Sequence, residues 1–130
     1  MEFTLDKHEQ YVVLTLKEPA FNNDITPALK ATTLTLSAEG FCNIVFDLSA
    51  VQSCPDSQDL SSLLAADRLC KKANGLFVIC GAQSDVLSQL EMSSLDQQLT
   101  IVSKLEEAAD LIFMSEIEKD LLGSFDEESE

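Results

Sequence analysis

The sequence has few of the residues on which catalytic and metal-binding sites depend. Its 130 residues include no tryptophan, one tyrosine and a single histidine, His8. A serine–histidine triad and a histidine-containing zinc site both lack support, because His8 is the only candidate and stands far from the other polar motifs. The four cysteines contain no Cys-x-x-Cys pair, and neither glycine-rich nucleotide-binding motif occurs. We therefore expect a protein that is not an enzyme and needs no metal or other cofactor.

Long apolar runs are also absent. No run approaches the roughly 20 residues that cross a bilayer, and the first ten residues lack the basic stretch and apolar block of a signal peptide. These features predict a cytoplasmic protein with no direct membrane insertion, whose cysteines are reduced and partly buried. The apolar fraction of 45% is ordinary for a globular protein, and 130 residues can bury a core as one domain.

Basic residues are scarce: 8 Lys and Arg stand against 23 Asp and Glu, a net charge of −15. Such a chain is repelled by phosphate groups, which excludes nucleic acid and anionic membranes as partners. Well over half of the net charge lies between Glu106 and Glu130, where Lys119 is the single base. We interpret this segment as a solvated helix face that ends at Gly123, followed by an acidic, disordered tail. The predicted division is a domain over 1–122 and a tail over 123–130.

Strand and helix patterns alternate along the chain. Short β-branched or continuous apolar runs predict strands, and apolar residues spaced three and four apart predict helices. The strands are expected at 11–16, 43–48, 76–80 and, as an edge strand, 99–102; the helices are expected at 26–40, 60–73, 84–90 and 104–122. This order predicts right-handed crossovers and a mostly parallel sheet. Gly75 is expected to end the second helix in the left-handed conformation.

Residues 53–60, SCPDSQDL, follow the second buried strand and precede a helix. Asp56 or Ser57 is expected to cap that helix, and the charge of Asp59 suits its amino-terminal end. Loops at the carboxyl ends of parallel strands form the usual functional edge of such a sheet. A serine there is exposed to a partner, and its phosphorylation would add about −1.5 to −2 charges beside two carboxylates.

Catalytic interpretations of this segment are weaker. Cys54 has Asp56 and Asp59 as near neighbours, and their charges raise rather than lower a thiol pKa. Asp47, Asp56 and Asp59 could form a magnesium cluster of the kind that accepts a phosphoryl group. That chemistry usually also needs acids on the first strand and a late lysine, and neither is evident.

An ordered set of segments resembles the STAS domain family, which includes bacterial anti-sigma-factor antagonists. Residues 56–60, DSQDL, are similar to the family motif D-S-[ST]-G-[LIV]. Residues 21–29 are similar to L-D-x-x-x-[AS]-x-x-L, with asparagine in place of aspartate. The glycine-led strand at 74–81 and the turn M-S-S-L at 92–95 also match. The resemblance runs from about Tyr11 to Leu122.

The resemblance implies an α/β fold with a single STAS-like domain: a four- to five-stranded, mixed, mostly parallel sheet with about four helices packed mainly on one face. It implies a partner, an anti-sigma-factor or switch-type serine kinase, which releases the antagonist when a serine is phosphorylated. By position that serine is Ser57. The implied partner-binding residues are Asn22, Asp24, Asp56, Ser57, Gln58, Asp59 and Leu60.

Two residues of the motif depart from the family pattern, since Gln58 and Asp59 stand where a second hydroxyl residue and a glycine are usual. Two interpretations follow. The chain is either a bacterial antagonist controlled by phosphorylation of Ser57, or a phosphorylation-independent scaffold or accessory subunit of a stress-signalling assembly or a lipid-transport complex.

Overall fold

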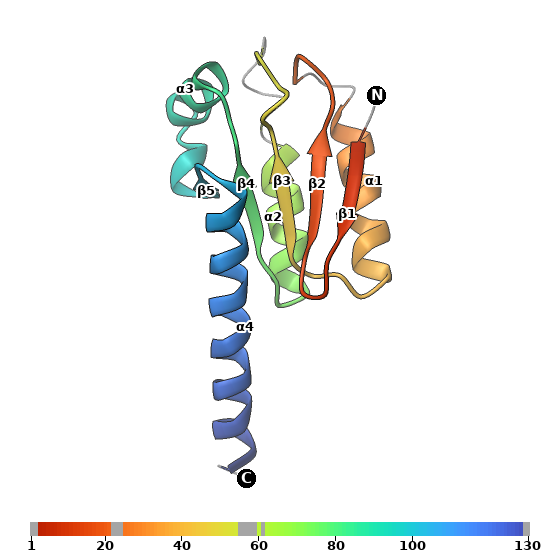
Figure 1. The fold of residues 1–130 in the computed structure, drawn as a ribbon, viewed down its shortest axis with the longest axis vertical. Coiled ribbons are helices and arrows are strands. Elements are labelled where there is room, and N and C mark those ends of the chain that lie inside the picture. Colours follow the sequence, from red (N-terminus) through yellow and green to blue (C-terminus); the bar gives the residue numbers. More distant parts are fainter. Residues whose placement is uncertain (1–2, 22–24, 55–59, 61, 129–130) are drawn as a thin grey trace.

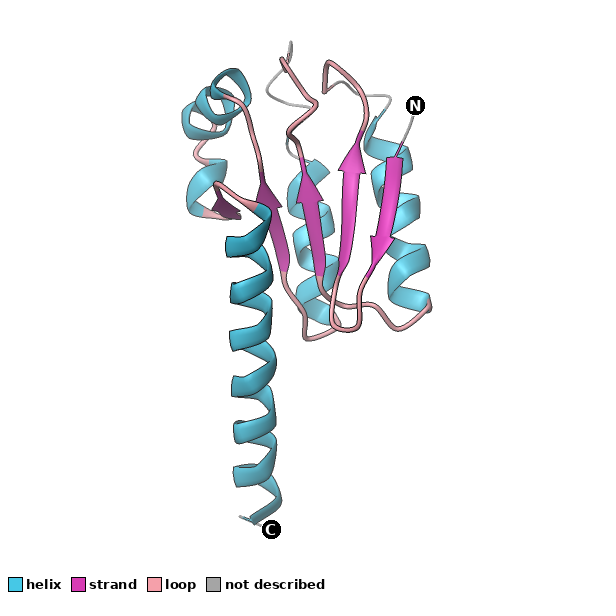
Figure 2. Ribbon diagram, viewed as in Figure 1, coloured by secondary structure: helices cyan, strands magenta, loops and turns pink. Residues whose placement is uncertain are grey.

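The computed structural model describes residues 3–21, 25–54, 60 and 62–128, and for Thr26 and residues 122–128 it describes the backbone only. Within these residues one sheet and four α-helices form (Figures 1 and 2). In chain order the elements are β1 (Phe3–Lys7), β2 (Val12–Leu16), α1 (Ile25–Ala38), β3 (Ile44–Asp47), α2 (Ser62–Lys72), β4 (Phe77–Cys80), α3 (Ser84–Met92), the 3₁₀ turn η2 (Leu95–Gln97), β5 (Thr100–Val102) and α4 (Leu105–Glu128).

The sheet has five strands in the order β1-β2-β3-β4-β5, with β1 antiparallel to β2 and every other neighbouring pair parallel. The predicted mixed, mostly parallel α/β sheet is therefore confirmed, including the edge position of β5. Strand β1 was not among the strands predicted from residue patterns. Its side chains are mostly exposed, because it forms the other edge of the sheet, so its sequence FTLDK lacks a buried strand's apolar run.

The two faces of the sheet carry separate cores. One face packs against α1, α2 and α3, through residues such as Leu29, Leu63 and Val86. The opposite face is smaller, and of the described helices α4 covers it, with Ala108 and Ile112 packed on Val13, Val45, Val78 and Cys80. The expectation that the helices lie mainly on one face is met by three of the four described α-helices.

The turn after α2 differs from prediction. After α2 the left-handed residue is Asn74, with φ of 63°, and not Gly75. A glycine is required at position 75 because there is no room for a side chain: a Cβ there would lie 1.9 Å from the carbonyl oxygen of Cys42. Ser94, the second serine of the M-S-S-L turn, also has a left-handed φ, of 60°.

Helix α4 is longer than predicted. It was expected to end at Gly123, but its backbone continues to Glu128, and it projects well past the lower end of the sheet in Figure 1. The predicted end at Gly123 is therefore wrong. No described helix is both long and apolar enough to span a membrane.

Candidate functional site

The candidate site lies at the carboxyl ends of β2, β3 and β4. These strands are parallel and end at one level, because Thr15 pairs with Asp47, and Asp47 pairs with Cys80. The loops that follow them lie together at the upper end of the molecule in Figure 1. Their clustering follows from the parallel arrangement, which sends every crossover out at the same edge.

The loop after β2 pairs directly with the loop after β3. Ala20 and Ser53 form an isolated parallel bridge. The Phe21 N–H donates to the Ser53 carbonyl oxygen at 2.9 Å, and the Gln52 N–H donates to the Pro19 carbonyl oxygen at 2.7 Å. The two loops therefore run side by side for several residues beyond the ends of their strands.

Buried side chains anchor the loops after β2 and β3 in the larger core. Phe21, Val51 and Cys54 belong to the larger core, each with at most 3% of its surface exposed, and the Phe21 ring meets the Phe46 ring at a centroid distance of 6.5 Å. Leu60 is fully buried in the same core. Leu60 lies just before α2, where a leucine gains more from the apolar core than from solvent. Its predicted part in partner binding stays a prediction.

The other predicted site residues lie outside the described residues: Asn22, Asp24, Asp56, Ser57, Gln58 and Asp59. Their flanks are described. Phe21 immediately precedes the first segment, Cys54 immediately precedes Pro55, and the Phe21 N–H bonds to the residue before Cys54. The structure therefore brings together the points at which the two predicted segments start.

A second polar contact set joins the loop after β3 to the loop after β4. The Ser49 N–H donates to Asp47 Oδ1 at 2.9 Å, and Gln83 Nε2 donates to the Ser49 carbonyl oxygen at 2.8 Å. Gly81 has φ of 72°, and a Cβ there would lie 2.8 Å from Asp47 Oδ1. We call Asp47, Ser49, Gly81 and Gln83 the loop brace. Sequence reasoning missed it, although Gly81 directly after a buried strand was a usable signal.

The loop brace changes the interpretation of Asp47. One oxygen of its carboxylate accepts a backbone hydrogen bond, which gives it a structural task in shaping the loop. The two other members of the hypothetical magnesium cluster, Asp56 and Asp59, lie outside the described residues. Among the side chains that are described, no group of three or more His, Cys, Asp or Glu is placed to hold a metal ion.

The cysteines, which lie at both ends of the sheet, are packed as apolar side chains. Cys54, Cys70 and Cys80 are buried, and Cys42 is half-buried. Burial raises the pKa of the Cys80 thiol to about 12, with a further contribution from Asp47, and burial likewise raises the pKa of Cys70 to about 12. The raised pKa values favour the protonated thiols at neutral pH, and a protonated thiol is a poor nucleophile.

The comparison with protein families gives one match: the sequence model of the STAS domain matches residues 3–108. The chain belongs to the STAS domain family. The matched region contains the five-stranded sheet, the loop brace and the Ala20–Ser53 bridge, and it ends in the first turn of α4. No curated protein matches the chain.

Solved structures share this fold at low sequence identity. An anti-sigma factor antagonist from Mycobacterium paratuberculosis is 20% identical, with a TM-score of 0.72 over 85% of this chain and 92% of that chain. The anti-sigma factor antagonist SpoIIAA in its unphosphorylated form is 18% identical, with a TM-score of 0.70 over 85% of this chain and 96% of that chain. Bacillus SpoIIAA in its phosphorylated form has a TM-score of 0.62, at 18% identity over 85% and 99% of the two chains.

The same fold also occurs inside a much longer protein. The murine anion transporter Slc26a9 is 12% identical, with a TM-score of 0.65 over 84% of this chain and 18% of that chain. The STAS fold by itself therefore does not distinguish a separate regulator from a domain of a larger assembly.

Proposed function

We propose that this STAS domain is a non-enzymatic, protein-binding regulator of the anti-sigma-factor antagonist type, working in the cytoplasm of a bacterial cell. Its partner is an anti-sigma-factor or switch-type serine kinase. The Ala20–Ser53 bridge is the observation that carries this proposal. It fixes the starts of both predicted contact segments at one edge of the sheet, so that Asn22 and Asp24 can act together with residues 56–59 on one partner.

We propose further that Ser57 is the switch. Its phosphate would add about −1.5 to −2 charges next to Asp56 and Asp59, in a chain that already carries a net charge of −15. Repulsion from acidic groups of a bound partner would then favour release. The protein SpoIIAA, which shares this fold, has structures in an unphosphorylated and a phosphorylated form. This pair of structures supports a phosphorylation-controlled cycle here.

The switch is tested by incubating the protein with its cognate kinase and ATP, followed by intact-mass measurement. We expect wild type to gain the mass of one phosphate group and Ser57→Ala to gain none. Cys54 and Leu60 hold the ends of this segment in the core. Cooperative urea unfolding of Ser57→Ala is therefore the control that the variant keeps its fold, even if the loss of a helix cap lowers its midpoint. A mass gain that persists in Ser57→Ala would refute the assignment of Ser57.

The second candidate function, a phosphorylation-independent scaffold or accessory subunit, is favoured by Gln58 and Asp59, which replace the second hydroxyl residue and the glycine of the family motif. The same kinase assay on Gln58→Ser/Asp59→Gly separates the two functions. Phosphate incorporation only in this restored variant would mean that the native motif no longer serves the kinase, and would favour the scaffold. Equal incorporation in wild type would favour the switch.

A further inference from the structure

Helix α4 has two faces with different surroundings. Ala108 and Ile112, one turn apart, are fully buried against the sheet. Farther along, Glu116 receives a hydrogen bond from Asn43 of the loop before β3, which holds the middle of the helix to the body. The rest of the helix projects past the sheet (Figure 1). Side chains on the face of α4 opposite Ala108 and Ile112 point away from the core, although the Phe113 ring meets the Tyr11 ring edge-on at a centroid distance of 5.9 Å.

That outward face is apolar. Phe113, Met114, Ile117 and Leu121 have between 42% and 59% of their surface exposed, and we call these four residues the α4 stripe. Phe113, Ile117 and Leu121 are spaced four apart, so they form one row along the helix, and Met114 stands beside them in the next row. Contiguous exposed apolar side chains of this kind are typical of interaction sites, because exposing them to water is unfavourable.

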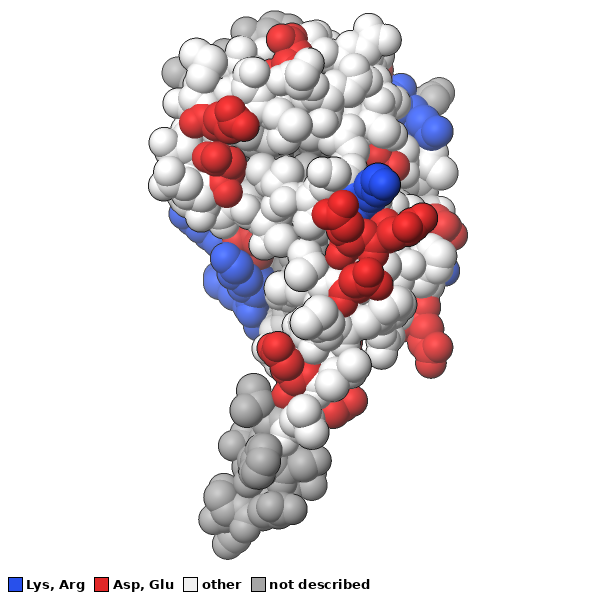
Figure 3. All heavy atoms as spheres, turned by 60° about the vertical axis from the view of Figure 1, so that its left-hand side comes forward, with Lys and Arg blue, Asp and Glu red and all other residues white. Residues whose placement is uncertain are grey.

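Acidic side chains border the α4 stripe. Asp110 and Glu118 stand one turn before and one turn after Met114, in the same row of the helix, and both are exposed. From Glu106 to Leu121 the helix has six acids against one base: Glu106, Glu107, Asp110, Glu116, Glu118 and Asp120, against Lys119. Figure 3 shows acidic side chains spread over this side of the molecule with uncharged surface between them.

We propose that the α4 stripe is a docking site for a basic amphipathic helix of a partner protein. Apolar residues of such a helix would cover the stripe, and its Lys or Arg residues would meet Asp110 and Glu118. The charge selects this occupant over two others. A second copy of α4 would bring like charges together, and an anionic membrane would be repelled.

This docking site is separate from the loops of the proposed switch. The stripe begins beside Tyr11, at the amino end of β2, and continues along α4 where the helix projects past the sheet. The carboxyl edge of the sheet lies at the other end of the molecule (Figure 1). It also lies beyond residue 108, where the match to the STAS domain ends. A partner bound to the stripe therefore leaves the carboxyl edge accessible, and the binding of this partner does not depend on the phosphorylation of Ser57.

The test uses a fluorescent synthetic helical peptide with Leu along one face and Lys along the other, whose binding to the full chain is measured by anisotropy. The variant Ile117→Gln/Leu121→Gln replaces two of the four stripe residues. Glutamine is a good helix former, so the helix is retained. The matched control is Met92→Gln, which changes an even more exposed apolar residue, 80% exposed, at the end of α3. A second variant, Asp110→Asn/Glu118→Gln, removes the bordering charges.

We expect the peptide to bind wild type and Met92→Gln equally. Ile117→Gln/Leu121→Gln should weaken binding at least about tenfold, and Asp110→Asn/Glu118→Gln should weaken binding and reduce its sensitivity to salt. Equal binding by the stripe variant would overturn the proposal. So would equally tight binding of a scrambled peptide of the same composition, which would reveal charge attraction alone. Sedimentation showing a wild-type dimer that the stripe variant abolishes, without peptide binding, would make a second copy the occupant and refute it too.

Discussion

Replacing Gly75 by alanine is expected to destabilise the protein by about 3 kcal/mol, because the added methyl group would overlap the backbone of Cys42. An added Cβ would lie 1.9 Å from the carbonyl oxygen of Cys42, 2.4 Å from its carbonyl carbon and 2.7 Å from its Cβ. Two of these three atoms are backbone. They cannot move away cheaply, because the chain next enters β3, where the Ile44 N–H donates to the Leu76 carbonyl oxygen at 2.9 Å.

The matched control is Gly40→Ala. Gly40 has φ of 99°, but no atom lies within 4 Å of its added Cβ. Its replacement therefore costs only backbone strain, about 1 kcal/mol, whereas Gly75→Ala costs the steric conflict. Urea unfolding followed by circular dichroism gives both free energies. A Gly75→Ala variant no less stable than Gly40→Ala would contradict the packing of Gly75 against Cys42.

The central strands and the fold were predictable from sequence because their signals are local. β3 and β4 are buried on both faces, so each appears as a continuous apolar run. The edge strand β1 has no such run, and its pairing with β2 depends on partners across a turn. The end of α4 was missed for a similar reason: Gly123 is a local stop signal, and the backbone continues through it.

The candidate site was predictable only in part. Its location followed from the alternation of strands and helices, which places residues 53–60 at a carboxyl edge. The Ala20–Ser53 bridge and the contact of Gln83 with Ser49 join residues more than thirty positions apart. Periodicity and capping patterns describe neighbours in sequence, so they contain no information on such pairs. The burial of Leu60 was not predictable either, because a motif position does not reveal which way its side chain points.

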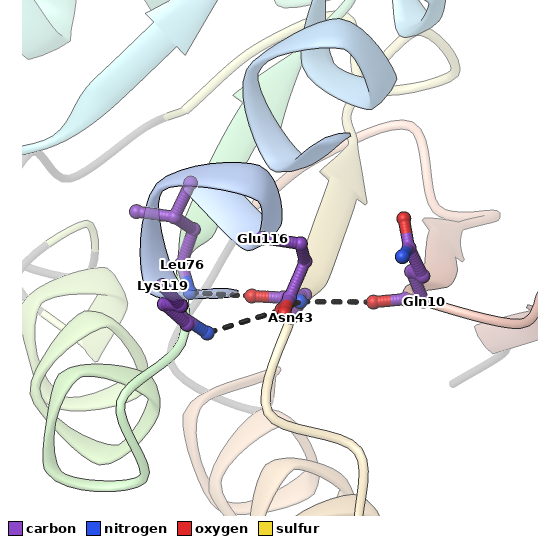
Figure 4. Close-up of polar contacts among 5 residues, drawn as sticks. All are labelled: Gln10, Asn43, Leu76, Glu116 and Lys119. Carbon is purple, nitrogen blue, oxygen red and sulfur yellow. Dashed lines mark hydrogen bonds and ion pairs between the residues drawn. The ribbon is translucent and has the colours of Figure 1, made fainter. Parts of the chain in front are cut away.

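The contacts of Asn43 are a further long-range feature, and they predict the second large effect. Asn43 has only 2% of its surface exposed. Its Nδ2 donates to the Gln10 carbonyl oxygen at 2.9 Å and to Glu116 Oε1 at 2.6 Å, and its Oδ1 accepts from the Leu76 N–H at 2.9 Å (Figure 4). One amide side chain thus ties the turn before β2, the loop before β4 and helix α4 to the start of β3.

Asn43→Ala is expected to destabilise the protein by about 3 kcal/mol, because several part-buried donors and acceptors lose their partner at once. Gln83→Ala is the matched control: it removes an amide that makes one exposed hydrogen bond, and it should cost less than about 1 kcal/mol. Urea unfolding of both variants gives the comparison. Equal losses would show that the three contacts of Asn43 do not act in the folded protein.

The same contacts make stability depend on pH through Glu116. The hydrogen bond from Asn43 is the main cause that lowers the Glu116 pKa below its ordinary value, and Lys119, at 3.0 Å, lowers it further against the opposing effect of burial. Because the folded pKa is the lower one, the Glu116 carboxylate stabilises the fold above its ordinary pKa. This contribution is lost as the pH falls through the folded pKa.

We therefore expect Glu116→Gln to be less stable than wild type at neutral pH and the difference to shrink on acidification. Glu118→Gln, an exposed acid two residues later, is the control for the general repulsion among the acids, which acidification also relieves. In an Asn43→Ala background the pH-dependent difference should be smaller, because its main cause is gone. A stability difference between wild type and Glu116→Gln that stays constant from neutral to acidic pH would contradict the lowered pKa. It would mean that Asn43 anchors α4 through the neutral polarity of residue 116 and not through its charge.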